Sequence, residues 1–146
     1  MKSFAALLTT LAVTASALGQ GITIGYPKDG DSFKRGETIK FRVETERAWD
    51  VSQIGIGIGI QKCQYLGGAG DKCFYNTSLG KLLYKGKFEP YETDGRPELK
   101  YHDTFDVKIP DDFEKGKAVI SVVHLALVGE SSDVQYDTVS VNIDVK

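Results

Sequence analysis

The chain has 146 residues, of which 41% are hydrophobic, and it carries 18 Lys and Arg against 20 Asp and Glu. These proportions are typical of a globular domain and exclude collagen-like, disordered and membrane-embedded chains. The formal net charge is -2, so the chain lacks the excess of basic residues that is typical of proteins that bind nucleic acid or anionic membranes. We therefore expect one domain that acts as a monomer, with no nucleic-acid partner and no membrane insertion.

Residues 1–19 have the pattern of a secretory signal peptide. A short basic start precedes an apolar run from Phe4 to Val13, and Ala15-Ser16-Ala17 supplies the small residues that signal peptidase accepts. Cleavage after Ala17 or after Gly19 fits this pattern and leaves a domain at residues 20–146. A membrane anchor would need about 20 apolar residues, roughly twice the length of this run. The sequence thus predicts a secreted, extracellular protein.

From residue 22 onward the chain consists of short β-like segments separated by Gly, Pro and Asp clusters. In most of them apolar and polar residues alternate, as in strands with one buried face. The segments are residues 22–24, 39–43, 54–60, 79–85, 101–109, 118–128 and 139–145. Helical spacing of apolar residues does not persist anywhere. The pattern predicts an all-β fold, an immunoglobulin-like antiparallel β-sandwich of about seven strands, with a closed barrel as the alternative.

Residues 54–60 alternate isoleucine with glycine, so we expect every isoleucine to project to one face of a strand and the other face to carry no side chain. Glycine inside a strand is destabilising, which indicates that another group lies directly on this backbone. We expect that group to be a tyrosine or Trp49 of the same domain. An exposed strip would instead favour strand addition by a second chain.

Cys63 and Cys73 are the only cysteines, and in a secreted protein they are expected to form a disulfide. Closing a loop of about ten residues stabilises a fold by at most about 2.7 kcal/mol on the chain-entropy estimate. The sequence Asn76-Thr77-Ser78 follows and is the only N-glycosylation sequon. Asn76 is therefore a candidate glycan site, and an unmodified polar turn is the alternative.

Aromatic residues gather between residues 84 and 101, interspersed with Lys and Glu. They are Tyr84, Phe88, Tyr91 and Tyr101. Exposed aromatics with charged neighbours are typical of protein-recognition loops and of surfaces that stack on sugar rings, although ordinary sandwich loops carry them too. We take these four residues as the candidate partner-binding site.

The residues that could support catalysis do not form a recognisable motif. His102 and His124 are outside any zinc-binding H-E-x-x-H pattern and any serine nucleophile elbow. The alternation predicts that His102 faces solvent, whereas His124 interrupts an apolar run and is expected to be a hydrogen-bonded histidine of the core or sheet face. Most carboxylates lie in turns, where they satisfy backbone donors. We expect no catalytic activity, no metal and no cofactor.

Six segments, in order, resemble landmarks of a fungal family of necrosis-inducing secreted effectors. They are residues 50–58, 79–84, 104–110, 115–118, 129–132 and 139–143. The resemblance covers most of the predicted domain. It implies an effector that binds plant receptor-like kinases, suppresses pattern-triggered immunity and can provoke cell death without catalysis. Action outside the host cell and action in the host cytoplasm both remain open.

Residues 24–38 are similar to the opening of fungal cell-wall-associated sandwich domains, in which Pro, Gly, an aromatic residue and another Gly recur. This second resemblance covers only the first two strands. It implies an alternative function, in which the chain is a secreted wall-associated protein that binds polysaccharide.

Overall fold

The structure is a computed structural model that describes residues 21–65, 71–73, 78–130 and 133–146. Within these ranges every helix or strand is a β-strand, which confirms the all-β prediction. The described residues accordingly provide no helix that is long and apolar enough to span a bilayer. The predicted signal peptide and the candidate glycan site at Asn76 lie outside the described residues.

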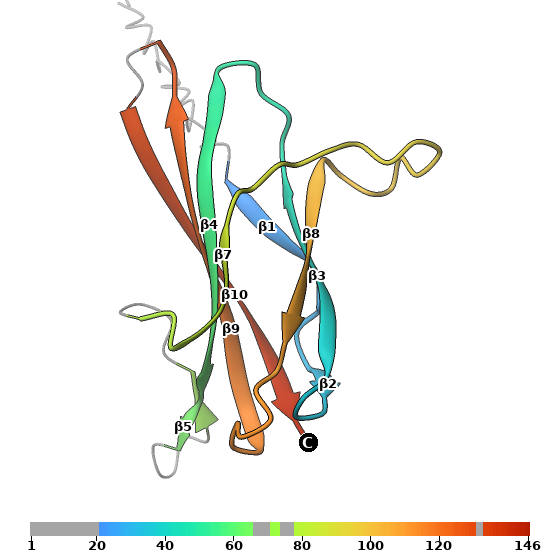
Figure 1. Ribbon diagram of the computed structural model, residues 1–146, viewed down its shortest axis with the longest axis vertical. Coiled ribbons are helices and arrows are strands. Elements are labelled where there is room, and N and C mark those ends of the chain that lie inside the picture. The colour runs from blue at the N-terminus through green and yellow to red at the C-terminus, as the bar shows by residue number, and fades with distance from the viewer. Residues whose placement is uncertain (1–20, 66–70, 74–77, 131–132) are drawn as a thin grey trace, which may run out of the picture.

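The described strands form two sheets that pack face to face as a sandwich, together with a separate pair of short strands (Figure 1). The smaller sheet has the order β1-β3-β8, with β1 at Ile22–Tyr26, β3 at Thr38–Thr45 and β8 at His102–Lys108. The larger sheet has the order β2-β10-β9-β4-β7. Its strands are Asp31–Phe33 (β2), Asp133–Val145 (β10), Gly116–Val128 (β9), Val51–Lys62 (β4) and Lys81–Gly86 (β7). The separate pair is β5 at Gln64–Tyr65 and β6 at Asp71–Lys72.

The strand order agrees with an immunoglobulin-type sandwich. When β1, β3 and β8 are named A, B and E, the strands β4, β9 and β10 take the places of C, F and G in the facing sheet. The two sheets hold eight described strands, in agreement with the predicted sandwich of about seven, and the additional short strand β2 lies between the expected strands at residues 22–24 and 39–43. One described pair departs from the antiparallel pattern, since β2 runs parallel to β10.

The crossing from β1 to β2 explains this parallel pair. β1 pairs with β3 in the smaller sheet, whereas β2 pairs with β10 in the larger one. Between them, Gly30 N–H donates to the backbone oxygen of Asn142 at 2.9 Å, and the Asn142 N–H donates to Asp29 Oδ1 at 2.8 Å. These bonds attach the turn to β10 and bring the chain across the open edge of the sandwich.

The core lies between the facing sides of the two sheets, and the predicted alternation places its residues correctly. On β3, Ile39, Phe41 and Val43 are buried while Lys40 is exposed. On β9 all consecutive residues from Ala118 to Val122 are buried, so side chains on both faces of the strand are covered. A central strand with neighbours on both sides and covered faces has this pattern.

The glycine face of β4 is covered from within the domain, as predicted, but the covering residue is Leu79. A Cβ added at Gly59 would lie 2.7 Å from the Leu79 Cβ and still closer to the Leu79 backbone oxygen. Gly80 adopts a positive φ of 71°, which turns the chain so that Leu79 folds back over β4. Trp49 does not cover the strip, since its side chain is 95% exposed.

The prediction that all the isoleucines share one face is wrong at Ile54. Ile56, Ile58 and Ile60 are buried, whereas Ile54 is 47% exposed. The pairing of β4 with β9 shifts register between Gln53 and Gly55. Such a bulge inserts one extra residue into the strand, so the residues before it lose the alternation that holds after it.

Candidate functional site

A groove lies between the β3–β4 connection and the segment that leads from β7 to β8. Figure 1 shows these two segments at the same end of the sandwich. The volume of the groove is about 470 Å³. We call it the upper groove and define it by its lining: Glu46, Ala48, Val51, Gln53, Ile54, Lys87, Phe88, Glu89, Pro90 and Tyr101. Three segments that are distant in sequence therefore meet here, and two of the four predicted site residues are among them.

Backbone hydrogen bonds hold the β7–β8 segment in place. Tyr91 and His102 exchange a pair of them, at 2.8 and 3.1 Å, and the Thr45 N–H donates to the Tyr101 backbone oxygen at 2.8 Å. The Glu89 N–H donates to Asp103 Oδ2 at 2.9 Å. The aromatic residues of this segment consequently have defined positions against β3 and β8.

Two of the four predicted partner-binding residues are partly or almost wholly withdrawn from the surface. Phe88 is only 2% exposed, with its ring centroid 6.4 Å from that of Phe105 and 5.1 Å from that of His124. Its assignment to a contact surface is corrected, because Phe88 borders the groove but its ring is enclosed by the core and offers almost no surface to a partner. Tyr84 is half-buried, and its ring lies 4.6 Å from Phe105.

Of the other two predicted residues, Tyr101 lines the upper groove, whereas Tyr91 is outside the lining and is exposed on the same segment between β7 and β8. Tyr91 is 47% exposed, and the other side of its ring rests 4.7 Å from the His102 ring. Tyr101 is half-buried and lines the groove, with the Arg47 guanidinium carbon 6.0 Å from its ring centroid. These tyrosines are rigid amphipathic side chains of the kind that anchor protein interfaces.

The sequence interpretation missed two residues of this surface. Trp49 is the most exposed large apolar side chain among the described residues and lies next to the groove-lining Ala48. A single Trp in a polar connection between two strands was a signal that could have identified it as an anchor. Ile54 lines the groove, and nothing in the Ile-Gly alternation indicated the bulge that turns it outward.

His124 lies beneath the groove and is buried, which confirms the prediction of a hydrogen-bonded histidine in the core. Its Nε2 contacts Oε1 of Gln53, a residue that lines the groove. Its Nδ1 lies 3.6 Å from Asp137 Oδ2, beyond hydrogen-bonding distance, and has no other partner in the described part of the chain. Burial lowers the pKa of His124, and the nearby Asp137 carboxylate opposes that shift only in part. The neutral imidazole is therefore the dominant form at pH 7.

The prediction for His102 is wrong, because its side chain is buried instead of facing solvent. The backbone bridge to Tyr91 brings the Tyr91 ring over the imidazole. The His102 Nδ1 lies 2.5 Å from the backbone oxygen of Lys100. The alternation along the strand had predicted an exposed His102, but the Tyr91 ring covers it in the folded chain.

The groove residues offer apolar surface, hydroxyl and amide groups, and paired charges. Two of the pairs at its rim are Lys87 with Glu89 at 3.9 Å and Lys100 with Glu46 at 3.8 Å. Over the residues that the structure describes, no three His, Cys, Asp or Glu side chains gather closely enough to hold a metal ion. This arrangement is suited to noncovalent recognition.

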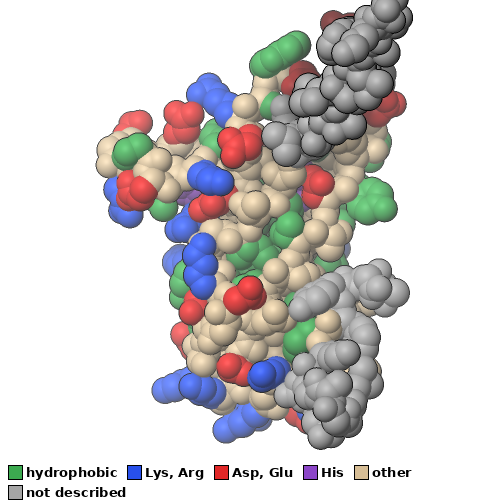
Figure 2. Space-filling view, turned by 180° about the vertical axis from the view of Figure 1, so that it is seen from behind, with side chains coloured by type: hydrophobic (Ala, Val, Ile, Leu, Met, Phe, Trp, Pro, Cys, Tyr) green, Lys and Arg blue, Asp and Glu red, His purple; other side chains and the backbone are tan. Residues whose placement is uncertain are grey.

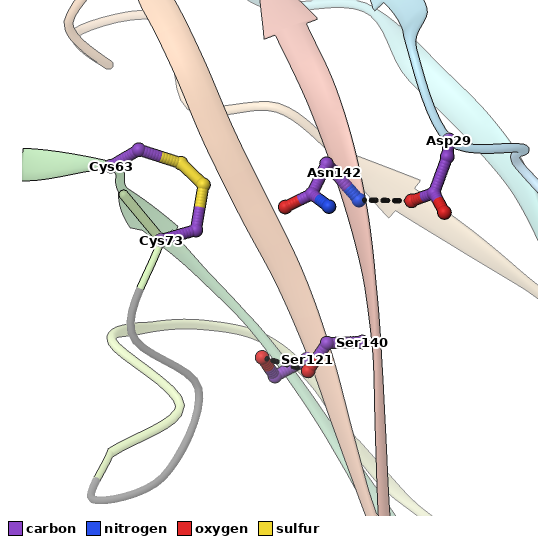
Figure 3. The surroundings of a disulfide bond; sticks show 6 residues. All are labelled: Asp29, Cys63, Cys73, Ser121, Ser140 and Asn142. Carbon is purple, nitrogen blue, oxygen red and sulfur yellow. Dashed lines mark hydrogen bonds between the residues drawn. A yellow bond between two sulfur atoms is a disulfide. The ribbon is translucent and has the colours of Figure 1, made fainter. Parts of the chain in front are cut away.

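Cys63 and Cys73 form a disulfide, as predicted, with their Cα atoms 4.3 Å apart. Figure 3 shows it beside β9, near the hydrogen bond of 2.8 Å that joins the Ser121 and Ser140 hydroxyls across β9 and β10. Cys63 is buried, and its N–H donates to the Lys117 backbone oxygen at 2.9 Å. The disulfide is at the end of β4 away from the upper groove, so it braces the fold and leaves the groove accessible.

Comparison with known proteins identifies a family. No curated protein matches the chain. The profile of the Nis1 family matches residues 15–144, a range that contains the whole sandwich except the end of β10. At the level of an effector-like family, this agrees with the resemblance found in the sequence. The chain belongs to the Nis1 family.

Proposed function

We propose that this protein is a secreted fungal effector that acts by binding a host protein. The proposed targets are plant receptor-like kinases, whose engagement would suppress pattern-triggered immunity and can lead to cell death. The observation that carries the proposal is the match of the Nis1 family over residues 15–144. The proposal assigns no catalytic role to any residue.

The anatomy of the upper groove supports a protein-binding function. Trp49 and Tyr91 are exposed in the two connections that contribute to the groove, and Tyr101 and Ile54 line it. Arg47 at the rim pairs with Glu92 at 3.1 Å. An aromatic centre surrounded by charged, solvent-accessible residues is typical of protein interfaces, in which Trp, Tyr and Arg supply most of the binding energy.

The disulfide supports the secreted location, since disulfides persist in oxidising compartments and are rare in the cytosol. The proposal therefore includes removal of residues 1–17 or 1–19 by signal peptidase, and a glycan at Asn76. Mass spectrometry of the protein purified from culture medium tests both, because it reports the N-terminal residue and any added sugar mass.

The binding experiment uses the secreted form, residues 20–146, with immobilised cytoplasmic domains of plant receptor-like kinases. Saturable binding is expected, and Trp49→Ala and Tyr91→Ala are each expected to weaken it at least about tenfold, as for central aromatic anchors. Tyr136→Ala is the matched control, because Tyr136 is also a strongly exposed aromatic residue but lies on β10, away from the groove lining.

A parallel arm with insoluble chitin and glucan separates the proposal from the wall-binding alternative. Retention on polysaccharide without kinase binding would overturn the proposed function. Kinase binding that Tyr136→Ala removes, and that both groove variants leave unchanged, would place the contact on β10 and overturn the assignment of the groove.

A further inference from the structure

Three chain segments form a second pocket at the opposite end of β3 from the upper groove. Its volume is about 510 Å³. The lining residues are Lys34, Arg35, Asp111, Lys115 and Lys146. Four cationic side chains thus face one carboxylate, and Figure 2 shows Lys and Arg side chains gathered at this lower end of the molecule. We call it the basic pocket.

The backbone around the basic pocket is fixed by hydrogen bonds between the three segments. The Arg35 N–H donates to the Lys146 backbone oxygen at 3.3 Å, and the Lys146 N–H donates to the Phe33 oxygen at 2.9 Å. The Gly36 N–H donates to the Ile109 oxygen at 2.9 Å. The β2–β3 turn, the segment after β8 and the end of β10 are therefore linked, so the positions from which the cations extend are set by the fold.

The acidic residues around the pocket already interact with other groups of the chain. Each of the three carboxylates in the β8–β9 connection pairs with a lysine that extends from a neighbouring strand. The pairs are Asp111 with Lys108 at 2.8 Å, Asp112 with Lys81 at 2.8 Å, and Glu114 with Lys62. The Glu37 carboxylate accepts a hydrogen bond from the Lys34 backbone N–H at 2.7 Å, so it is engaged within its own turn.

The four basic side chains of the pocket are not neutralised by such ion pairs. Among the described residues, no carboxylate forms an ion pair within 4.0 Å with the side chain of Lys34, Arg35, Lys115 or Lys146. Like charges held around one hollow repel each other, and a bound anion removes that repulsion. The arrangement therefore favours an anionic ligand.

We propose that the basic pocket binds a compact oxyanion, namely a phosphate group. Arg35 can present its guanidinium fork to two phosphate oxygens, and the lysines act as point charges around it. The cationic surface is confined to one end of a chain whose net charge is -2, so it is too small for an extended polyanion such as a nucleic acid or an anionic membrane. The phosphate can be free or attached to a polypeptide side chain.

This proposal goes beyond the proposed function and does not depend on it, because the two sites lie at opposite ends of the sandwich. The experiment uses isothermal titration calorimetry of the secreted form at low ionic strength. The ligands are pyrophosphate, a phosphoserine peptide and the same peptide with unmodified serine. Vesicles that contain phosphatidylserine form a fourth arm.

Saturable binding of pyrophosphate or of the phosphopeptide is expected, together with loss of affinity at high salt. Binding of pyrophosphate alone indicates a free anion as the ligand, and tighter binding of the phosphopeptide indicates a phosphorylated protein. The triple variant Lys34→Gln, Arg35→Gln, Lys115→Gln is expected to bind at least about tenfold more weakly, since charge-assisted hydrogen bonds are lost. Asp111→Asn is expected to bind more tightly, because it removes the acidic side chain from the described lining.

The matched control removes three positive charges elsewhere, by Lys85→Gln, Lys87→Gln and Lys100→Gln, and thermal unfolding checks that both triple variants are folded. The proposal is overturned if no phosphate ligand binds saturably, if the control weakens binding as much as the pocket variant, or if only vesicles bind.

Discussion

Gly57 and Gly59 are neighbours on the same face of β4, yet replacing each with alanine should have different consequences. At Gly59 the added Cβ would lie 2.7 Å from the Leu79 Cβ and 2.9 Å from the Leu79 carbonyl carbon. At Gly57 the nearest atoms are side-chain methyl groups of Leu79 and Val123, both at 3.3 Å. Backbone cannot move aside as a side-chain methyl can, so only the change at Gly59 forces β4 away from the segment that leads into β7.

The magnitude follows from two opposing terms. Replacing glycine by alanine in a strand gains about 0.5–1 kcal/mol, because the unfolded chain loses conformational freedom. Overpacking against a rigid neighbour costs about 1–3 kcal/mol or more. The clash at Gly59 involves backbone atoms, so its cost is at the upper end of that range, about 3 kcal/mol, and subtracting the gain leaves an expected loss of about 2–2.5 kcal/mol in the free energy of unfolding for Gly59→Ala. At Gly57 a smaller packing cost offsets the gain, and we expect Gly57→Ala to change this free energy by less than about 0.5 kcal/mol.

Urea unfolding followed by circular dichroism measures both variants against the unmodified domain. Adding Leu79→Ala to Gly59→Ala should not restore stability, because the clashing Leu79 atoms belong to the backbone and Cβ, which alanine retains. The reasoning would be refuted if Gly59→Ala were as stable as the parent, or if Leu79→Ala rescued it fully.

Three further predictions concern the core, the disulfide and the buried histidine. Phe88→Ala should lower the free energy of unfolding by about 3–5 kcal/mol, whereas Tyr91→Ala should change it by less than about 1 kcal/mol; urea midpoints that are similar for the two would contradict the burial assignment. Replacing Cys63 and Cys73 by serine should cost at most about 2.7 kcal/mol in the same assay, and a larger loss would mean that the disulfide does more than close its loop. Because burial lowers the pKa of His124 in the folded state, the unfolded chain binds more protons below the ordinary histidine value of 6.5, so stability should fall as the pH drops through that value. Unfolding curves from pH 7 to pH 5 should show a smaller loss for His124→Gln, and identical pH profiles would show that His124 does not contribute.

The strands of this protein could be predicted from the local sequence, because every second residue of a strand with one buried face is apolar. Ile39, Phe41 and Val43 needed no knowledge of their partners to be recognised as one buried face. The disulfide was equally predictable, since two cysteines in a chain that was expected to be secreted allow one pairing.

The candidate surfaces depended on contacts between distant segments, which no local pattern encodes. Phe88 and Tyr91 stand three residues apart in one aromatic segment, but Phe88 meets Phe105 and His124 in the core while Tyr91 pairs with His102 at the rim. The same bridge buried a histidine that strand parity had placed in solvent.

The β-sandwich and its single disulfide could thus be predicted from the amino-acid order, because alternation and cysteine count are local properties. Which aromatic residues are exposed, and that Lys34, Lys115 and Lys146 surround one pocket, became known from the folded chain. Side-chain exposure and electrostatic fields depend on the residues that the fold places nearby, and most of these are far away along the chain.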